Sequence, residues 1–274
     1  MTGALAALAA NASLEISVRE LGDVAQARGV VSPGQLVYVA HPPAQPWSET
    51  ERACRVLRDA GLEPVPHVPA RLVEDSAELV RLIRSFVASG ARAALFISGD
   101  QAGAAGSYQS VADVLRDPAL RDAGLERVSL AGHPEGHPRV PLAAIRRAER
   151  EKAELAAAAG LQATLVGQFA FEAEPILAWA RELGTGGVPA RLVAGLAGPA
   201  KASTLFKYAQ RCGIGPSIRA LGDDPPAVEE SPLGLMRSLA QARDSRLDGL
   251  HIYCFGGFLR TARWLREVAS GALG

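Results

Sequence analysis

The sequence predicts a single α/β domain over residues 1–274, a (β/α)8 TIM barrel with a short N-terminal helix. Three observations support this prediction. Short apolar, β-branched runs alternate with longer Ala-, Leu- and Arg-rich segments of helical period, which indicates repeated βα units and a parallel sheet. Eight such runs can be counted. The chain of 274 residues also falls near the length of about 250 at which barrels form one unit.

The eight expected strands are Ala12–Val18, Gln35–Ala40, Glu63–Val68, Ala91–Ser98, Arg127–Ala131, Ala163–Phe169, Ala190–Gly195 and Gly249–Phe255. The expected helices are Glu49–Ala60, Asp75–Ser89, Ser107–Ala123, Leu142–Ala159, Glu174–Leu183, Lys201–Cys212, Leu233–Arg243 and Leu259–Ser270. Most of these helices begin beside Ser, Asp or Pro and end at Gly, as capping requires. Equal numbers of strands and helices favour a closed barrel over an open, doubly wound sheet. The stretch Gly213–Ser231 is expected to be an elaborated loop.

The apolar start of the chain resembles a signal peptide, but no Lys or Arg precedes the run, so a short helix is the preferred interpretation. No stretch approaches the roughly 20 apolar residues that a membrane span needs. The 29 basic and 29 acidic residues cancel, which favours a small-molecule ligand over nucleic acid or a membrane surface. The scattered Cys54, Cys212 and Cys254 fit reduced core residues of a cytoplasmic protein.

Polar residues in the first strand indicate a functional site. Leu14 and Ile16 share one face with Val18, so Glu15 is expected to point into the barrel together with Ser13 and Ser17. A carboxylate in the barrel interior is costly unless it is paired or used. From the residues alone, a catalytic Glu15 and a structural Glu15 are equally good interpretations.

Further polar residues follow other strands. His67 ends the third strand, Asp100 follows the fourth and Gln168 lies in the sixth, so all three should meet Glu15 at the C-terminal mouth of the barrel. Each also has a structural explanation, as a hydrogen-bonded core histidine, a helix cap and an inter-strand bridge, respectively. His251 and Tyr253 share the inward parity and are secondary candidates.

The segment Gly132-His133-Pro134-Glu135-Gly136-His137-Pro138 follows the fifth strand. Its His, Glu and His could suggest a metal site, but two prolines make it an extended loop rather than the helix that carries zinc-hydrolase histidine pairs. No metal site is therefore expected. Two imidazoles at a barrel mouth suit a flat, anionic ligand, and a phosphate-bearing cofactor could use the basic residues beyond them, unless these only form a solvated helix face.

Five segments at strand ends form an ordered set. They are Ser13-Leu14-Glu15-Ile16, Ser98-Gly99-Asp100, the His133–Pro138 loop, Gln168-Phe169-Ala170-Phe171 and His251-Ile252-Tyr253. In this order they resemble the motifs Ser-Phe-Glu-Phe, Arg-Gly-Asp, Tyr-Pro-Glu-x-His-Pro, Gln-Phe-Phe-Phe and His-Phe-Tyr of the methylenetetrahydrofolate reductases, flavin enzymes built on an eight-fold barrel. The resemblance spans nearly the whole chain and is closest to a divergent, short branch of the family.

The resemblance implies interconversion of 5,10-methylenetetrahydrofolate and 5-methyltetrahydrofolate through FAD, with NADH or NADPH as hydride source. Glu15 would be the general acid that opens the folate ring, and Asp100 and Gln168 would hold the pterin. The implied cofactor contacts are His67, Gly99, His133, His137 and Lys152. The reaction would serve methionine biosynthesis or run toward methyl-folate oxidation, and assembly into a homo-oligomer stays open.

The sequence also departs from the family pattern. His133 stands where the family has Tyr, Ser98 replaces the Arg before Gly-Asp, and Ala40-His41-Pro42 replaces a Thr-Tyr flavin contact. Such losses would suit a flavin-independent variant, in which a nicotinamide passes its hydride directly to the folate. A non-redox barrel, metal-dependent or pterin-binding, is the remaining alternative.

Overall fold

The computed structural model describes residues 2–212, 229–242 and 246–273. Eight parallel strands close into a barrel in the order β1-β10-β7-β6-β5-β4-β3-β2. The strands are β1 (Ser13–Ile16), β2 (Leu36–Val39), β3 (Glu63–Pro69), β4 (Ala93–Ile97), β5 (Arg127–Gly132), β6 (Gln162–Ala170), β7 (Ala190–Ala197) and β10 (Gly249–Tyr253). All eight expected strands are confirmed, and the chain is a TIM barrel.

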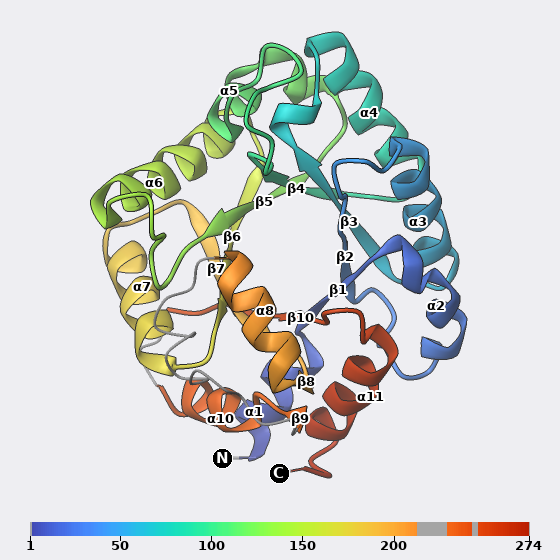
Figure 1. The fold of residues 1–274 in the computed structure, drawn as a ribbon, viewed down its shortest axis with the longest axis vertical. Coiled ribbons are helices and arrows are strands. Elements are labelled where there is room, and N and C mark those ends of the chain that lie inside the picture. Colours follow the sequence, from blue (N-terminus) through green and yellow to red (C-terminus); the bar gives the residue numbers. More distant parts are fainter. Residues whose placement is uncertain (1, 213–228, 243–245, 274) are drawn as a thin grey trace.

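Helices surround the strand ring (Figure 1). They are α1 (Thr2–Ala10), α2 (Leu21–Ala27), α3 (Trp47–Asp59), α4 (Ser76–Ala88), α5 (Val111–Arg116), α6 (Leu142–Ala158), α7 (Ala173–Thr185), α8 (Ala202–Cys212), α10 (Leu233–Gln241) and α11 (Phe258–Ala269), with the 3-10 turns η1 (Val18–Glu20), η2 (Ala70–Leu72) and η3 (Pro118–Asp122). The leading helix α1 was expected, and it packs against α10 and α11.

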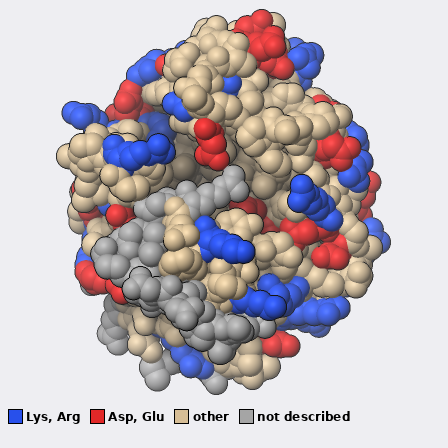
Figure 2. Space-filling view, in the orientation of Figure 1, with Lys and Arg blue, Asp and Glu red and all other residues tan. Residues whose placement is uncertain are grey.

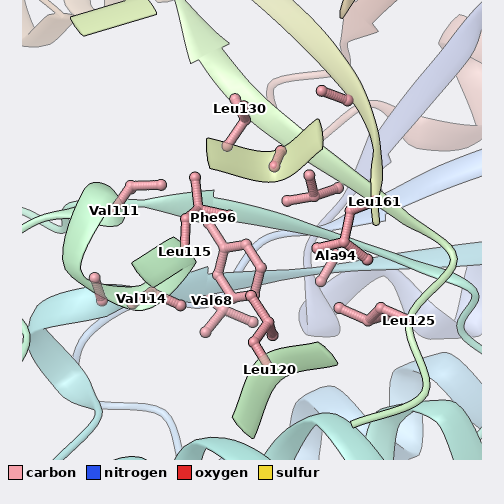
Figure 3. Packing of buried hydrophobic residues seen from close by; sticks show 14 of the residues in the cluster. Val68, Ala94, Phe96, Val111, Val114, Leu115, Leu120, Leu125, Leu130 and Leu161 are labelled. Carbon is pink, nitrogen blue, oxygen red and sulfur yellow. The ribbon is translucent and has the colours of Figure 1, made fainter. Parts of the chain in front are cut away.

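Alternation along the strands separates residues that pack outward against the helices from residues that fill the barrel interior. Leu14 and Ile16 of β1 are buried among outward-facing residues that pack against the helices. On the other side of the molecule, Phe96 and Leu130 lie in a second cluster between the strands and α4, α5 and η3 (Figure 3). Inside the barrel a small group around Tyr38 fills the interior. Because apolar residues fill the outward faces of the strands, the polar residues of the site lie on the inward faces.

A β-bulge interrupts the pairing of β6 with β7. Val166 pairs with Val193, yet Phe169 pairs with Gly195, so one extra residue is accommodated between them. At this point the two strands approach closely, because a Cβ atom on Gly195 would lie 1.9 Å from the carbonyl oxygen of Gly167. Only glycine fits at position 195.

The structure corrects three expectations. The segment expected as one helix from Ser107 is the short helix α5 followed by the 3-10 turn η3. Asp117 ends α5 and caps η3, and Pro118 is the first residue of η3. Helix α2 and the antiparallel pair β8 (Ala200–Lys201) and β9 (Glu229–Glu230) were not expected. Ser17 does not join Glu15 in the barrel, since it donates its hydroxyl to the Glu20 carboxylate at the start of η1.

Most of the expected loop Gly213–Ser231 lies outside the described residues, as does the side chain of Cys212. Cys54 and Cys254 are buried free thiols, and burial raises the pKa of each to about 12, in keeping with core residues. In the part of the chain that the structure describes, no helix is long and apolar enough to cross a bilayer.

Candidate functional site

The carboxyl group of Glu15 points into the barrel, as the alternation along β1 predicts. Its side chain is 23% exposed, and its Oε2 lies 3.6 Å from Nε2 of His67 at the end of β3. Burial, with a smaller contribution from the negative charge of Glu20, raises the pKa of Glu15 to about 7. Glu15 is therefore a carboxyl group that can be protonated near neutrality.

His67 is a neutral neighbour of this acid. Burial, and then the nearby His41, lower the pKa of His67 to about 3, so the imidazole carries no charge at neutral pH. Its Nε2 is buried and has no hydrogen-bond partner among the described residues. A charged imidazole would favour the carboxylate form of Glu15, whereas this neutral one leaves Glu15 free to hold a proton.

Below these two groups the barrel interior is polar and connected. Tyr38 shares a hydrogen bond of 2.8 Å with Ser129, and Nδ1 of His251 lies 2.9 Å from the hydroxyl of Ser13. The rings of Tyr38 and His251 meet edge to face, with centroids 4.5 Å apart. Tyr38 and Ser129 were missed by the sequence reasoning, although alternation along Leu36–Val39 would have placed Tyr38 inside.

An aromatic wall stands at the mouth on the side of β6 and β10. The bulge brings Phe169 beside Tyr253, with ring centroids 5.7 Å apart, and Phe255 lies 5.1 Å from Phe169. Tyr208 of α8 packs on Phe255, so this helix covers part of the mouth, and Figure 1 shows it crossing in front of the strand ring. Phe255 adopts a φ of 48°, in the left-handed region that is strained for an aromatic residue.

Gln168 lies in the bulge beside this wall. Its side-chain oxygen accepts a hydrogen bond of 3.0 Å from the backbone N–H of Phe169. The side chain is therefore folded back on its own strand, and the structure does not bring it into contact with Glu15. Its expected part in holding a pterin stays a prediction.

The loop His133–Pro138 is held from beneath by helix α6. The buried carboxylate of Glu149 accepts hydrogen bonds from the backbone N–H of His133 (2.7 Å), from Arg146 (3.0 Å) and from the indole of Trp179 (3.3 Å). Arg146 also donates to the carbonyl oxygens of His133 and Pro134, at 3.0 and 3.3 Å. This network fixes the loop at the mouth.

The two histidines of the loop face each other, with ring centroids 6.3 Å apart in a T-shaped arrangement. Burial first, then the charges of Lys152, His137 and Arg146, lower the pKa of His133 to about 4. His137 accepts a hydrogen bond from the backbone N–H of Arg139. In the described part of the chain, no three His, Cys, Asp or Glu side chains gather to hold a metal ion, so His133, Glu135 and His137 form no such group.

Lys152 lies between α6 and the barrel. Its ammonium donates a hydrogen bond of 3.0 Å to the carbonyl oxygen of Ala131, and burial lowers its pKa. The structure thus places this cation beneath the loop, in contact with the strand that precedes it.

The loop after β4 carries Gly99 and Asp100 at the mouth, and Asp100 is exposed. Gly99 has a φ of 93°, and a Cβ atom there would lie 2.4 Å from the side-chain oxygen of Gln101. The amide oxygen and nitrogen of Gln101 are both buried and have no hydrogen-bond partner among the described residues. The sequence reasoning missed Gln101, because nothing in the pattern signals that this loop side chain is buried.

Together these elements frame one face of the barrel. Figure 2 shows a hollow near the middle of this face, with acidic and basic side chains along its edges. Glu15 and His67 lie on the interior side, Gln101 and Asp100 on the β4 side and the two loop histidines on the β5 side. This arrangement suits a flat polar ligand with one end close to the carboxyl group of Glu15.

The buried histidines predict that acid destabilises the fold. The pKa values of His41 and His133 fall to about 4, and those of His67 and His251 to about 3, against 6.5 in an unfolded chain. Because the folded forms bind fewer protons, their stabilisation is present above pH 6.5 and is lost as the pH falls toward these values. The raised pKa values of Glu15 and Glu149 act in the opposite direction, but these are two groups against four histidines.

We therefore expect a lower free energy of unfolding at about pH 5 than at about pH 7.5, measured by urea denaturation. In the variant His251→Gln the difference between the two pH values should shrink. Equal stability at both pH values would contradict the burial of neutral histidines.

No protein-family model matches the chain. Among solved structures it is similar to a protein from Burkholderia cenocepacia J2315 assigned as a phosphonomutase (TM-score 0.56, 11% identity, 99% of this chain and 100% of that chain). It is also similar to dihydropteroate synthase from Thermus thermophilus in complex with 6HMPPP (TM-score 0.51, 12% identity, 96% and 93% covered). Another structure of that synthase gives a TM-score of 0.50 at 13% identity, with 94% of each chain covered. At such identities the similarity establishes the barrel fold alone.

Proposed function

We propose that this chain is an oxidoreductase of folate one-carbon chemistry that interconverts 5,10-methylenetetrahydrofolate and 5-methyltetrahydrofolate. The observation that carries the proposal is Glu15, an inward-facing carboxyl group at the barrel mouth whose pKa is raised to about 7. The motif resemblance supplies the substrate class. The chain also shares its barrel fold with dihydropteroate synthase, an enzyme whose name refers to a pteroate.

In the reductive direction Glu15 acts as a general acid. The protonated carboxyl group gives its proton to the folate nitrogen that leaves the methylene carbon, which opens the five-membered ring and produces an iminium ion. A hydride from NADH or NADPH then reduces the iminium carbon to the methyl group. Glu15 ends as a carboxylate, which regains a proton from solvent, and the neutral His67 at 3.6 Å offers no positive charge to hold it deprotonated.

The residues that the resemblance assigns to FAD do not fit that group. The space over Gly99 is taken by the side chain of Gln101. Lys152 is bonded to a backbone carbonyl group, and His133 is neutral, so neither offers a free positive charge to a pyrophosphate. We therefore favour the flavin-independent form of the reaction, in which the nicotinamide is a co-substrate that passes its hydride directly to the folate.

The test is an anaerobic assay of NADH or NADPH oxidation with 5,10-methylenetetrahydrofolate, with 5-methyltetrahydrofolate identified by mass spectrometry. We expect turnover in protein that has no flavin absorbance. The rate should fall as the pH rises through about 7, because the fraction of protonated Glu15 falls there.

Two controls accompany this assay. Omission of the folate gives the background oxidation, and added FAD should leave the rate unchanged. A rate that depends on added FAD would contradict the flavin-independent form. If the folate causes no oxidation of either NADH or NADPH, the proposed function is wrong.

A further inference from the structure

The contact between Glu15 and His67 is close to a hydrogen bond but is too long to be one. Oε2 of Glu15 and Nε2 of His67 lie 3.6 Å apart, roughly 0.6 Å beyond the usual N–H···O distance. Nε2 is also buried and has no hydrogen-bond partner among the described residues. Unpaired buried polar atoms destabilise a protein and are uncommon in native structures, so this nitrogen needs an explanation. A small movement of either side chain would pair the two groups directly.

The charge state of the imidazole decides what this nitrogen can do. Burial, and then the nearby His41, lower the pKa of His67 to about 3, so the ring is neutral near pH 7. In a neutral imidazole one nitrogen carries a hydrogen and the other is an acceptor. A carboxylate is a stronger acceptor than a protonated carboxyl group. With its hydrogen on Nε2, His67 therefore binds the ionised form of Glu15 more strongly than the protonated form.

The surroundings of the pair offer no other way to stabilise the carboxylate. The other titratable groups around the two residues are His41 and Tyr38 of the β2 segment, His251 and Cys254 of the β10 segment, and Glu20 of η1. Burial keeps the first four uncharged near neutrality, because it lowers the pKa values of the two histidines and raises those of the tyrosine and the cysteine. Glu20 carries a negative charge, which opposes ionisation of Glu15. Within the described ranges, none of these groups gives Glu15 a positive charge.

We propose that His67 is a positioning residue for the acid, whose Nε2–H binds the Glu15 carboxylate as Glu15 gives up its proton to the substrate. The proton moves from Glu15 to the folate nitrogen, and His67 keeps its own hydrogen throughout. A bond that strengthens during the proton transfer stabilises the transition state more than the state before it, and so raises kcat. The inference rests on the proposed function for its reaction. It gives His67 a part in proton transfer instead of the cofactor contact that the motif resemblance implies.

Two variants separate the hydrogen-bond donor from the bulk of the side chain. His67→Leu removes the donor, whereas His67→Gln keeps an N–H donor on a side chain of similar length. The first measurement is the NMR titration of the Glu15 carboxyl carbon in ligand-free protein with ¹³C-labelled glutamate, assigned by its loss in Glu15→Gln. The pKa of Glu15 is about 7 in the parent chain. We expect the midpoint to rise by about one pH unit in His67→Leu, because the ionised form loses its hydrogen bond, and to stay near that of the parent in His67→Gln.

The second measurement is kcat for folate-dependent oxidation of NADH or NADPH. At about pH 6, where Glu15 is largely protonated in all three chains, kcat of His67→Leu should be roughly 10-fold below that of the parent. The decline with rising pH should move upward together with the NMR midpoint, and His67→Gln should keep most of the rate. By urea denaturation, His67→Leu should be as stable as the parent or more stable, because apolar atoms replace an unpaired buried nitrogen. A purely structural histidine would give lower stability and an unmoved titration.

The parent chain supplies a test that needs no variant to fold. Above about pH 8, where Glu15 is ionised, the ¹⁵N signals of His67 should show that Nε2 carries the hydrogen. A hydrogen on Nδ1 instead would overturn the inference. A Glu15 midpoint that does not rise in His67→Leu, or that rises equally in His67→Gln, would overturn it as well.

The outcomes distinguish this inference from the proposed function, because the NMR measurements use no folate. An unmoved titration in a chain that reduces the folate would remove His67 from the mechanism and leave the function intact. A titration that moves as expected in a chain without folate-dependent oxidation would show that the function is wrong, and the part of His67 in that reaction would fall with it.

Discussion

Replacing Glu15 by Gln is expected to lower folate-dependent turnover by roughly 10²-fold or more, the usual scale for loss of a general acid. A carboxamide keeps the size and the neutrality of the protonated carboxyl group, but it has no acidic proton to give. Because burial and the negative charge of Glu20 both favour an uncharged side chain here, a neutral replacement should not disturb the barrel. Folate affinity should therefore stay close to that of the parent chain.

The measurement is kcat for methylenetetrahydrofolate reduction alongside the dissociation constant for 5-methyltetrahydrofolate. The residual rate of Glu15→Gln should also lose the decline above about pH 7 that the parent chain shows. Glu154→Gln, an exposed residue of α6, is the control and should behave as the parent does. Near-normal turnover of Glu15→Gln would remove this residue from the mechanism.

Replacing Arg146 by Met is expected to lower the free energy of unfolding by about 3–5 kcal/mol, the range for breaking a buried ion pair from one side. The Glu149 side chain is 1% exposed, and Arg146 is the guanidinium that pairs with it. Without Arg146, a buried carboxylate keeps only the hydrogen bonds of His133 and Trp179. The carbonyl oxygens of His133 and Pro134 lose a donor as well.

Urea denaturation of the variant and the parent gives this difference. Arg147→Met is the matched control on the same helix, where the side chain is exposed, and it should change stability little. The double variant Arg146→Met, Glu149→Gln should recover part of the loss, because the uncompensated charge is removed. A loss in Arg146→Met no larger than in Arg147→Met would show that the pair does not stabilise the loop.

The alternation along the strands was enough to predict the fold and the positions of two candidate site residues. It placed Glu15 inside the barrel and His67 at the same mouth, because a period of two holds wherever a strand is regular. The period of two does not continue through Gln168, because the bulge in β6 interrupts it there. A pattern of residue types gives no sign of an extra residue within a strand.

The contacts of side chains on helices and loops were beyond the sequence. Lys152 was expected to approach cofactor phosphates, which remains untested, and the structure shows its ammonium bonded to Ala131. Arg146 is indistinguishable from its exposed neighbour Arg147 in the sequence, yet it is buried. Burial of such residues depends on how helix α6 rotates against the barrel, which is decided by tertiary packing. Tertiary packing also decides the burial of the amide of Gln101, on the loop after β4, so no pattern in the sequence indicates it.

The bulge of β6 also sets the phase of the strand that carries it. Before it, Val166 faces the barrel interior, and after it Phe169 does so, an interval of three residues instead of two or four. Removing one residue at the bulge would exchange the faces of Phe169 and Ala170, turning the aromatic ring toward the helices and a methyl group toward the barrel mouth. The aromatic wall at the mouth therefore depends on the number of residues in β6 as well as on their identity.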